Sequence, residues 1–207
     1  MTAAASRAVF LDRDGVINRN RDDYVKSWEE FEFLPGALEA LQRLAGLDCR
    51  VVVVSNQSVI GRGIVTRATV EDIHRRMTDA IVQAGGRIDG IWYCPHRPEE
   101  KCGCRKPGDG LLRDAAQALD IELASSIMIG DAQSDIVAAK AAGCRAVLVK
   151  TGRGVEHAAR MPSSVLEGVY VAGDLAEAVA CIARLWQESS MPHEVSRGAD
   201  HESCPIG

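Results

Sequence analysis

Residues 8–15 read Ala-Val-Phe-Leu-Asp-Arg-Asp-Gly, so that four apolar residues run directly into a pair of carboxylates. A short apolar run that stops at a turn signal is typical of a buried strand. Two carboxylates at a strand end can hold a hard divalent cation, and one of them can attack phosphorus. The alternative is an ordinary turn, in which Asp and Gly are common, and this stretch alone does not separate the two.

Outward from this stretch, strand patterns and helix patterns alternate along the chain. Further strands are expected at residues 51–54, 88–93, 126–129, 146–149 and 169–172, and helices at residues 35–47, 66–81, 111–119, 136–142 and 175–186. Such alternation predicts a doubly wound α/β fold, with a mostly parallel sheet and helices on both faces. We expect no large cap domain. We expect residues 1–187 to form one domain and the polar residues 188–207 to form a disordered tail.

Composition excludes several classes of protein. The 207 residues carry a net charge of -5 without a basic stripe, which argues against a nucleic-acid partner. No apolar run approaches the ~20 residues that a membrane span needs. The first seven residues lack the charged start and apolar core of a signal peptide, so a cytoplasmic location is expected.

Three more polar clusters follow predicted elements in such a way that the sheet would place them close to Asp12 and Asp14. Each is by itself compatible with an ordinary helix cap, a loop or a solvated surface. Together they supply phosphate donors, cations and a further metal ligand, which phosphoryl transfer requires. The clusters are Ser55-Asn56-Gln57-Ser58, Arg105-Lys106-Pro107, and Gly130-Asp131 with Asp135 four residues later.

The order of these motifs resembles that of the haloacid dehalogenase superfamily of phosphatases, from about Ala8 to Gly152. The resemblance implies that Asp12 is the nucleophile, and that Asp14 is the general acid and base and also binds magnesium through its backbone carbonyl. It implies that Ser55 and Lys106 stabilise the phosphoryl group. It also makes Asp12, Asp14 and Asp131 the magnesium site, which Asp135 supports from behind.

A second metal site is predicted from soft ligands packed into eleven positions. The four ligands are Cys94, His96, Cys102 and Cys104, a common set for structural zinc. The cysteine count is odd, at seven, and a reducing compartment disfavours disulfides. Because all four ligands come from the protein, the site has no open position for catalysis. A zinc ion there would fix the loop that carries Arg105 and Lys106.

This zinc loop resembles that of two families within the superfamily, the heptose 1,7-bisphosphate 7-phosphatases and the histidinol-phosphatases. The stretches at residues 24–36 and 55–63 are more similar to the heptose enzymes, which supply an intermediate for nucleotide-activated heptose. The resemblance implies that the following residues contact substrate: Arg21, Asp22, Asp23, Tyr24, Asn56, Gln57, Ser58, Arg62 and Arg105.

The chain departs from the heptose pattern in two places. Ala132 stands where a lysine is usual, and the loop from Asn18 to Tyr24 is one residue longer. Arg19, Arg21 and Arg62 could supply the missing positive charge. Histidinol-phosphatase stays open as an alternative, as does a zinc-containing binding protein without catalysis. A small sugar bisphosphate is the expected partner, and the protein is expected to be a monomer.

Overall fold

The structure is a computed structural model, and it describes residues 6–188. A six-stranded sheet forms its centre, with every neighbouring pair parallel and the order β3-β2-β1-β4-β5-β6. The strands are β1 (Ala8–Leu11), β2 (Arg50–Asn56), β3 (Gly90–Cys94), β4 (Ile127–Gly130), β5 (Arg145–Val149) and β6 (Tyr170–Ala172). Apart from shifts of one or two residues at their ends, these are the strands that the sequence predicts.

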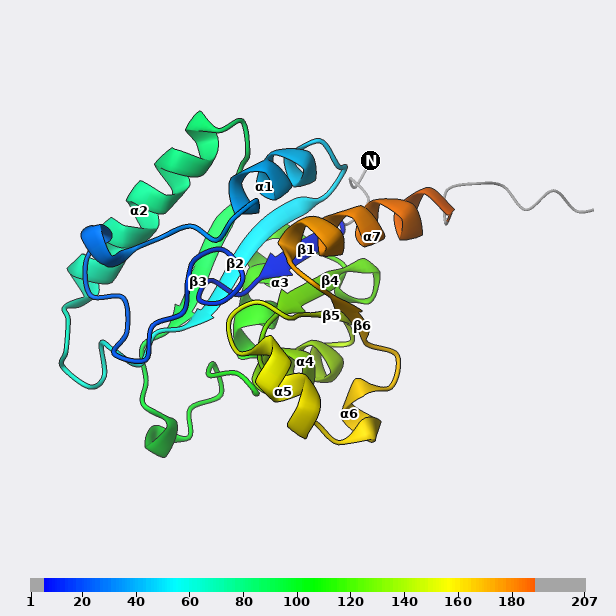
Figure 1. Ribbon diagram of the computed structural model, residues 1–207. Helices are drawn as coiled ribbons and strands as arrows, with labels where there is room; N and C mark the ends of the chain where they lie inside the picture. The colour runs from blue at the N-terminus through cyan, green and yellow to red at the C-terminus, as the bar shows by residue number, and fades with distance from the viewer. Residues whose placement is uncertain (1–5, 189–207) are drawn as a thin grey trace, which may run out of the picture.

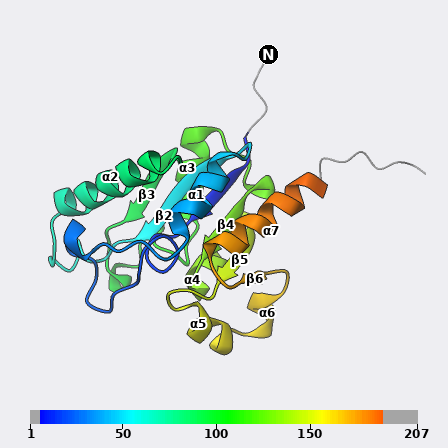
Figure 2. The same ribbon diagram turned by 45° about the horizontal axis from the view of Figure 1, so that its top comes forward.

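Helices cover both faces of this sheet (Figures 1 and 2). The helices are α1 (Ala37–Ala45), α2 (Arg67–Gln83), α3 (Gly110–Leu119), α4 (Gln133–Ala142), α5 (Gly154–Arg160), α6 (Ser163–Leu166) and α7 (Leu175–Glu188), with short 3-10 turns at Trp28–Glu30, Pro98–Glu100 and Leu123–Ser125. The sequence did not predict α5 and α6, which are short and lack an extended apolar repeat. Of the predicted tail, Glu188 ends α7, and residues 189–207 lie outside the described residues.

The core is divided into two layers by the alternation of side chains along the strands. Val9 and Leu11 of β1 pack with residues of α1, α2 and α7, whereas Ala8 and Phe10 pack with residues of α3 and α4. All four β1 side chains are fully buried. A strand covered on both faces reads as a continuous apolar run, which explains why β1 and the valines of β2 show no polar alternation.

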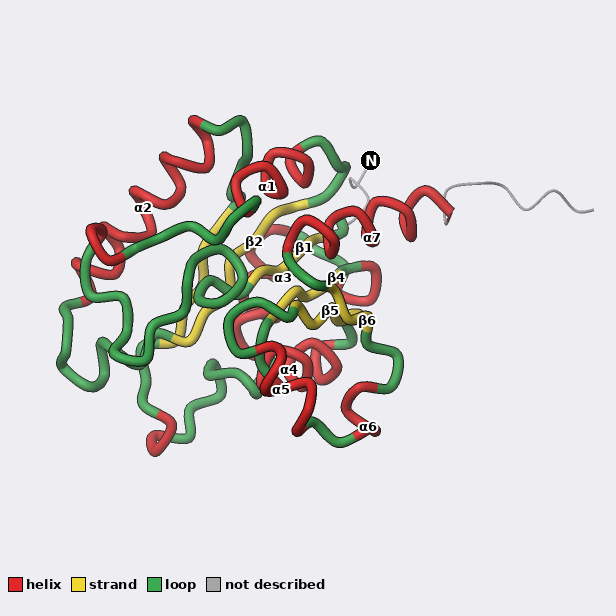
Figure 3. Tube along the Cα trace, viewed as in Figure 1, coloured by secondary structure: helices red, strands yellow, loops and turns green. Residues whose placement is uncertain are grey.

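The strand order reverses beside β1, because the chain first adds β2 and β3 on one side and then β4, β5 and β6 on the other. Ligands in such sheets bind outside the carboxyl ends of the strands at this reversal. Two long loops lie at that end, one after β1 and one after β3 (Figure 3). Among residues 6–188, no helix is both long enough and apolar enough to cross a bilayer.

Candidate active site

A cleft of about 260 Å³ lies at the carboxyl ends of β1, β2 and β4. It gathers side chains from all four polar clusters of the sequence, together with residues of the two long loops. Its predicted lining residues are Asp12, Asp14, Arg21, Asp22, Tyr24, Ser55, Asn56, Gln57, Ser58, Arg62, Arg105, Lys106, Asp131 and Asp135.

Lys106 is buried between two carboxylates at the base of this cleft. Its Nζ lies 2.9 Å from Asp12 Oδ1 and 2.7 Å from Asp135 Oδ1, and it donates a hydrogen bond of 2.8 Å to the Val54 carbonyl. Burial alone would lower the pKa of Lys106, but the charges of Asp12 and Asp135 raise it above its usual value. The ammonium therefore stays charged beside the nucleophile candidate.

Carboxylate oxygens of Asp12, Asp131 and Asp135 lie within 4.8 Å of one another. Burial raises the pKa of Asp12 to about 6 and that of Asp131 to about 8, and repulsion between the carboxylates adds to both shifts. One ammonium cannot neutralise three carboxylates. An all-oxygen set with this excess of negative charge fits a hard divalent cation such as Mg²⁺.

Two glycines bring the backbone close to Asp131. A Cβ on Gly15 would lie 2.1 Å from Asp131 Oδ2, and one on Gly152 would lie 2.2 Å from it. Both glycines have positive φ angles, of 90° and 57°. The same oxygen accepts a hydrogen bond of 2.8 Å from the Arg153 backbone N–H. The glycine of the Asp12-Arg13-Asp14-Gly15 motif is thus required for close approach, not only for a turn.

Asp14 is held by donors on both of its oxygens. Arg13 Nη2 donates to each oxygen at 2.9 Å, Asn18 Nδ2 donates to Oδ1 at 3.0 Å, and Gln57 Nε2 donates to Oδ2 at 2.8 Å. Burial acts to raise the pKa of Asp14, but the Arg13 charge and these hydrogen bonds outweigh it and lower the pKa. The carboxylate is thereby fixed in one orientation at the edge of the cleft.

The Ser55–Ser58 cluster divides between two faces. Gln57 Nε2 donates to Ser55 Oγ at 2.9 Å as well as to Asp14, so these two side chains share the Asp14 side. Asn56 points the other way, donating to the Lys106 carbonyl at 3.0 Å and accepting from the Lys106 N–H at 3.1 Å. Asn56 lines the cleft, yet both polar atoms of its side chain hold the loop that carries Lys106.

The four predicted zinc ligands meet in one cluster. The three Sγ–Sγ distances among Cys94, Cys102 and Cys104 are 3.3–3.5 Å, and His96 Nδ1 lies 3.5 Å from Cys94 Sγ and 3.3 Å from Cys104 Sγ. Disulfide bonding requires about 2.05 Å, whereas Zn–S bonds of about 2.3 Å in a tetrahedron give edges of about 3.8 Å. The arrangement therefore fits a bound metal ion better than it fits a disulfide.

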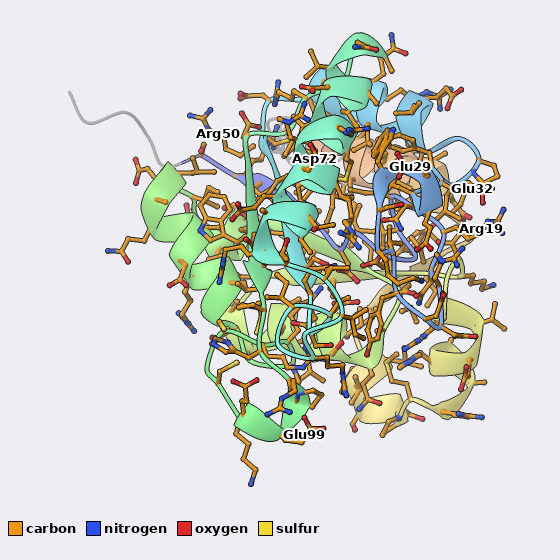
Figure 4. All side chains as sticks on the ribbon, turned by 90° about the vertical axis from the view of Figure 1, so that its left-hand side faces the viewer. Arg19, Glu29, Glu32, Arg50, Asp72 and Glu99 are labelled. Atoms are coloured by element: carbon orange, nitrogen blue, oxygen red, sulfur yellow. The ribbon has the colours of Figure 1, made fainter. Side chains whose placement is uncertain are left out.

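Two of the residues expected near substrate lie elsewhere. Arg19 does not line the cleft; it pairs with Glu32 at 2.9 Å on the molecular surface (Figure 4), whereas Arg21 and Arg62, the other two candidates for the missing positive charge, do line it. Asp23 is also absent from the lining, because it turns outward to pair with Arg21 and Lys26. The direction in which such loop side chains point is set by local ion pairs, which the sequence motif does not predict.

Sequence reasoning missed several residues of the site. Arg13 and Asn18 hold Asp14, although Arg13 lies inside the motif itself. Thr151 donates to the Gly15 carbonyl at 2.7 Å, and Arg153 lines the cleft. Both follow β5, whose carboxyl end joins the same edge of the sheet. Their position after a strand is the one signal that the sequence offers for them, because a lone threonine or arginine there belongs to no motif.

Comparison with known proteins agrees with this geometry. A HAD-hydrolase-like family model matches residues 103–178. The chain is 43% identical to the D-glycero-beta-D-manno-heptose-1,7-bisphosphate 7-phosphatase of Bordetella bronchiseptica, over 88% of this chain and 99% of that protein. It is also 43% identical to the D-glycero-alpha-D-manno-heptose-1,7-bisphosphate 7-phosphatase of Mycobacterium tuberculosis, over 68% of this chain and 78% of that protein.

The fold matches solved structures as well. A crystal structure of D,D-heptose 1,7-bisphosphate phosphatase from B. bronchiseptica, in complex with magnesium and phosphate, superposes with a TM-score of 0.80 at 42% identity. The match covers 88% of this chain and 99% of that one. These findings confirm the predicted superfamily and fold. The chain therefore belongs to the heptose bisphosphate phosphatase family of the haloacid dehalogenase-like hydrolases, and it is a phosphoric monoester hydrolase.

Proposed function

We propose that this protein removes the C7 phosphate of D-glycero-D-manno-heptose 1,7-bisphosphate, with Mg²⁺ as cofactor and an aspartyl-phosphate on Asp12 as intermediate. The observation that carries the proposal is the cluster of Asp12, Asp131 and Asp135 around the buried Lys106 ammonium. The names and high coverage of the relatives support the choice of substrate.

In the first step, a carboxylate oxygen of Asp12 attacks phosphorus in line with the bond to the C7 oxygen. That bond breaks as the new P–O bond forms, and Asp14 gives a proton to the departing alkoxide. Only the protonated form of Asp14 can do this; its lowered pKa makes that form a minor one, and the second step regenerates it. Lys106 and the Ser55 hydroxyl stabilise the charge on the transferring phosphoryl oxygens. In the second step, Asp14 takes a proton from water, which attacks phosphorus and restores the Asp12 carboxylate.

Magnesium would be held by Asp12, Asp131 and the Asp14 backbone, where it offsets repulsion between the nucleophile and the phosphate. Asp135 holds Lys106 at 2.7 Å and receives the Ala132 N–H at 3.0 Å, which suits a supporting role behind the metal ligands. At Cys94, His96, Cys102 and Cys104, zinc would clip the loop that delivers Arg105 and Lys106.

The second phosphate of the substrate calls for positive charge at the rim of the cleft. Arg62, Arg105 and Arg153 line it. The partners of their guanidinium groups are distant or neutral: Glu99 at 4.0 Å from Arg62, the His96 carbonyl for Arg105, and Asp22 at 3.8 Å from Arg153. Arg21 is instead neutralised by Asp23 and Glu30.

The test is to supply the heptose bisphosphate with and without Mg²⁺ and to follow the reaction by ³¹P NMR. We expect loss of the C7 resonance, retention of the C1 phosphate, and no turnover in excess EDTA. Acid quenching with labelled substrate should leave label on the wild-type protein and none on Asp12→Asn. Turnover that survives EDTA, or loss of the C1 phosphate first, would contradict the proposal.

Histidinol phosphate is the rival substrate, and one observation favours it. The exposed Asp22 carboxylate lines the cleft and could receive an amine. Histidinol phosphate should nevertheless be hydrolysed with a much lower kcat/KM, because it has no second phosphate to meet the rim arginines. A higher kcat/KM for histidinol phosphate would replace the heptose assignment.

A further inference from the structure

Arg13 is buried although it lies between the two carboxylates of the active-site motif. Its side chain is 1% exposed, and Asp14 is the acid with which it forms an ion pair. A guanidinium has five N–H donors and no acceptor, so each acceptor around a buried one matters, and the Nε of Arg13 has no hydrogen-bond partner among the described residues. Its Nη2 is used by Asp14, and its Nη1 lies 3.2 Å from Nε2 of His74 on α2.

His74 contacts the terminal nitrogen of the Arg13 guanidinium that does not bind Asp14. Its residue is 4% exposed, and its ring meets Tyr93 edge-on, with 5.3 Å between centroids. Arginine can only donate, so Nε2 must accept and the ring proton must lie on Nδ1. Burial lowers the pKa of His74 to about 3, and the Arg13 charge adds to this shift, so the ring is neutral and free to accept.

We infer that His74 is a positioning residue, which acts through Arg13 to hold the Asp14 carboxyl in the orientation that protonates the leaving group. The inference rests on the proposed function, in which Asp14 is the general acid. His74 lies on a helix remote from the sequence motifs, and it touches neither Asp14 nor the metal-binding carboxylates in the described contacts.

The effect of His74 on Asp14 depends on how many hydrogen bonds fix the Asp14 carboxylate. Asn18 and Gln57 each donate once, and Arg13 donates to both oxygens. Without an acceptor at His74, Nη1 of Arg13 would be left buried and unpaired, which favours a different guanidinium position. Asp14 would then lose the donor that spans both of its oxygens, and its carboxyl plane would be held only by the single hydrogen bonds from Asn18 and Gln57.

The consequence depends on the leaving group. A sugar alkoxide is strongly basic and needs a proton as it departs, whereas p-nitrophenolate departs without one. The parameter to measure is kcat/KM, because it reports events only up to release of the leaving group. It is therefore insensitive to the later step in which Asp14 acts as base toward water.

The experiment compares three variants with wild type on the heptose bisphosphate and on p-nitrophenyl phosphate. His74→Gln can place an amide oxygen near the position of Nε2, so it should retain most activity on both substrates. His74→Leu and His74→Asn cannot reach Arg13. Each should lose roughly tenfold or more in kcat/KM for the sugar phosphate, part of the usual contribution of general acid catalysis, and less than about threefold for the aryl phosphate.

Asp14→Asn is the reference, and it should show the same selectivity with a larger loss. If Asp14→Asn is selective but His74→Leu and His74→Asn lower both substrates equally or not at all, the inference is overturned and the acid role of Asp14 stands. If Asp14→Asn is not selective either, both assignments are overturned. Thermal melting verifies that each variant is folded. If His74→Leu does not fold, His74→Asn alone provides the test.

Discussion

The Asp12 carboxylate is kept ionised against the preference of its surroundings. Burial and the neighbouring carboxylates raise its pKa to about 6, and contact with Lys106 at 2.9 Å only partly offsets them. A raised pKa means that the ionised form costs free energy in the folded protein at neutral pH. The site thus holds negative charge where the proposed nucleophile and cation would act, and this lowers the free energy of unfolding.

Replacing Asp12 by Asn should therefore separate activity from stability. We expect kcat/KM to fall by roughly 10³-fold or more, as when other enzymes lose their nucleophile. The melting temperature at pH 7.5 without metal should equal or exceed that of wild type, because the substitution removes a buried carboxylate whose ionised form costs free energy. Asp79→Asn, an exposed change on α2, is the control with unchanged activity. Near-normal turnover would show that another group is the nucleophile.

Asn56 shows what a motif does and does not predict. The sequence placed Ser55, Asn56 and Gln57 at the strand end but could not say which way each one faces. Alternation along β2 decides it: Ser55 and Gln57 face Asp14, and Asn56 faces the loop of Lys106. All three lie at the predicted strand end, and both polar atoms of the Asn56 side chain hold the backbone of Lys106. Contact between Asn56 and substrate stays a prediction.

Asn56→Ala should lower kcat/KM by roughly 10- to 100-fold, because Lys106 would lose both hydrogen bonds that position its backbone and small misplacements are costly in catalysis. Zinc content should be unchanged, since the four ligands are untouched. Lys106→Ala on the Asn56→Ala background should add less than it does alone. Fully additive losses in that double-mutant cycle would show that the two residues act independently.

At the scale of elements, the loop after β3 joins the zinc cluster to the catalytic edge of the sheet. Its ends are Cys94, the last residue of β3, and Gly110, the first of α3. That these four residues come together was predictable, because closely spaced cysteine and histidine residues in a reducing compartment usually bind a metal ion. The contribution of Arg153 was not predicted, because a single arginine after a strand carries no such signature.

Cys102→Ser should remove the zinc, of which wild type is expected to hold about one per chain, and should lower activity although every catalytic carboxylate remains. The reason is that Lys106 lies two residues beyond Cys104 and moves with the loop. Cys144→Ala is the matched control, because Cys144 is buried outside the cluster. Metal analysis and kcat/KM on the same samples check this. A zinc-free variant with full activity would contradict the link between loop and catalysis.

For the molecule as a whole, stability, pH and magnesium should be coupled through the same carboxylates. The pKa of Asp131 is raised from 3.8 to about 8. Burial is the largest cause, and the negative charges of Asp12 and Asp135 come next. A folded-state pKa above the unfolded value means that the metal-free fold binds the extra proton. The stability that this group contributes is therefore fully present below about pH 3.8 and is lost as pH rises to about 8, and the corresponding loss for Asp12 is complete near pH 6.

Magnesium reverses this dependence because it binds the ionised carboxylates and must displace their protons. Between pH 6 and pH 8, the Mg²⁺ concentration that gives half of the maximal rise in melting temperature should fall roughly 10- to 100-fold, since about one to two protons are released on binding. Asp131→Asn should lose most of this pH dependence, whereas Asp72→Asn on the exposed face of α2 (Figure 4) should keep it. A magnesium midpoint that does not change with pH in wild type would show that Asp131 is already ionised at pH 6. The three carboxylates would then not repel one another strongly enough to require a cation.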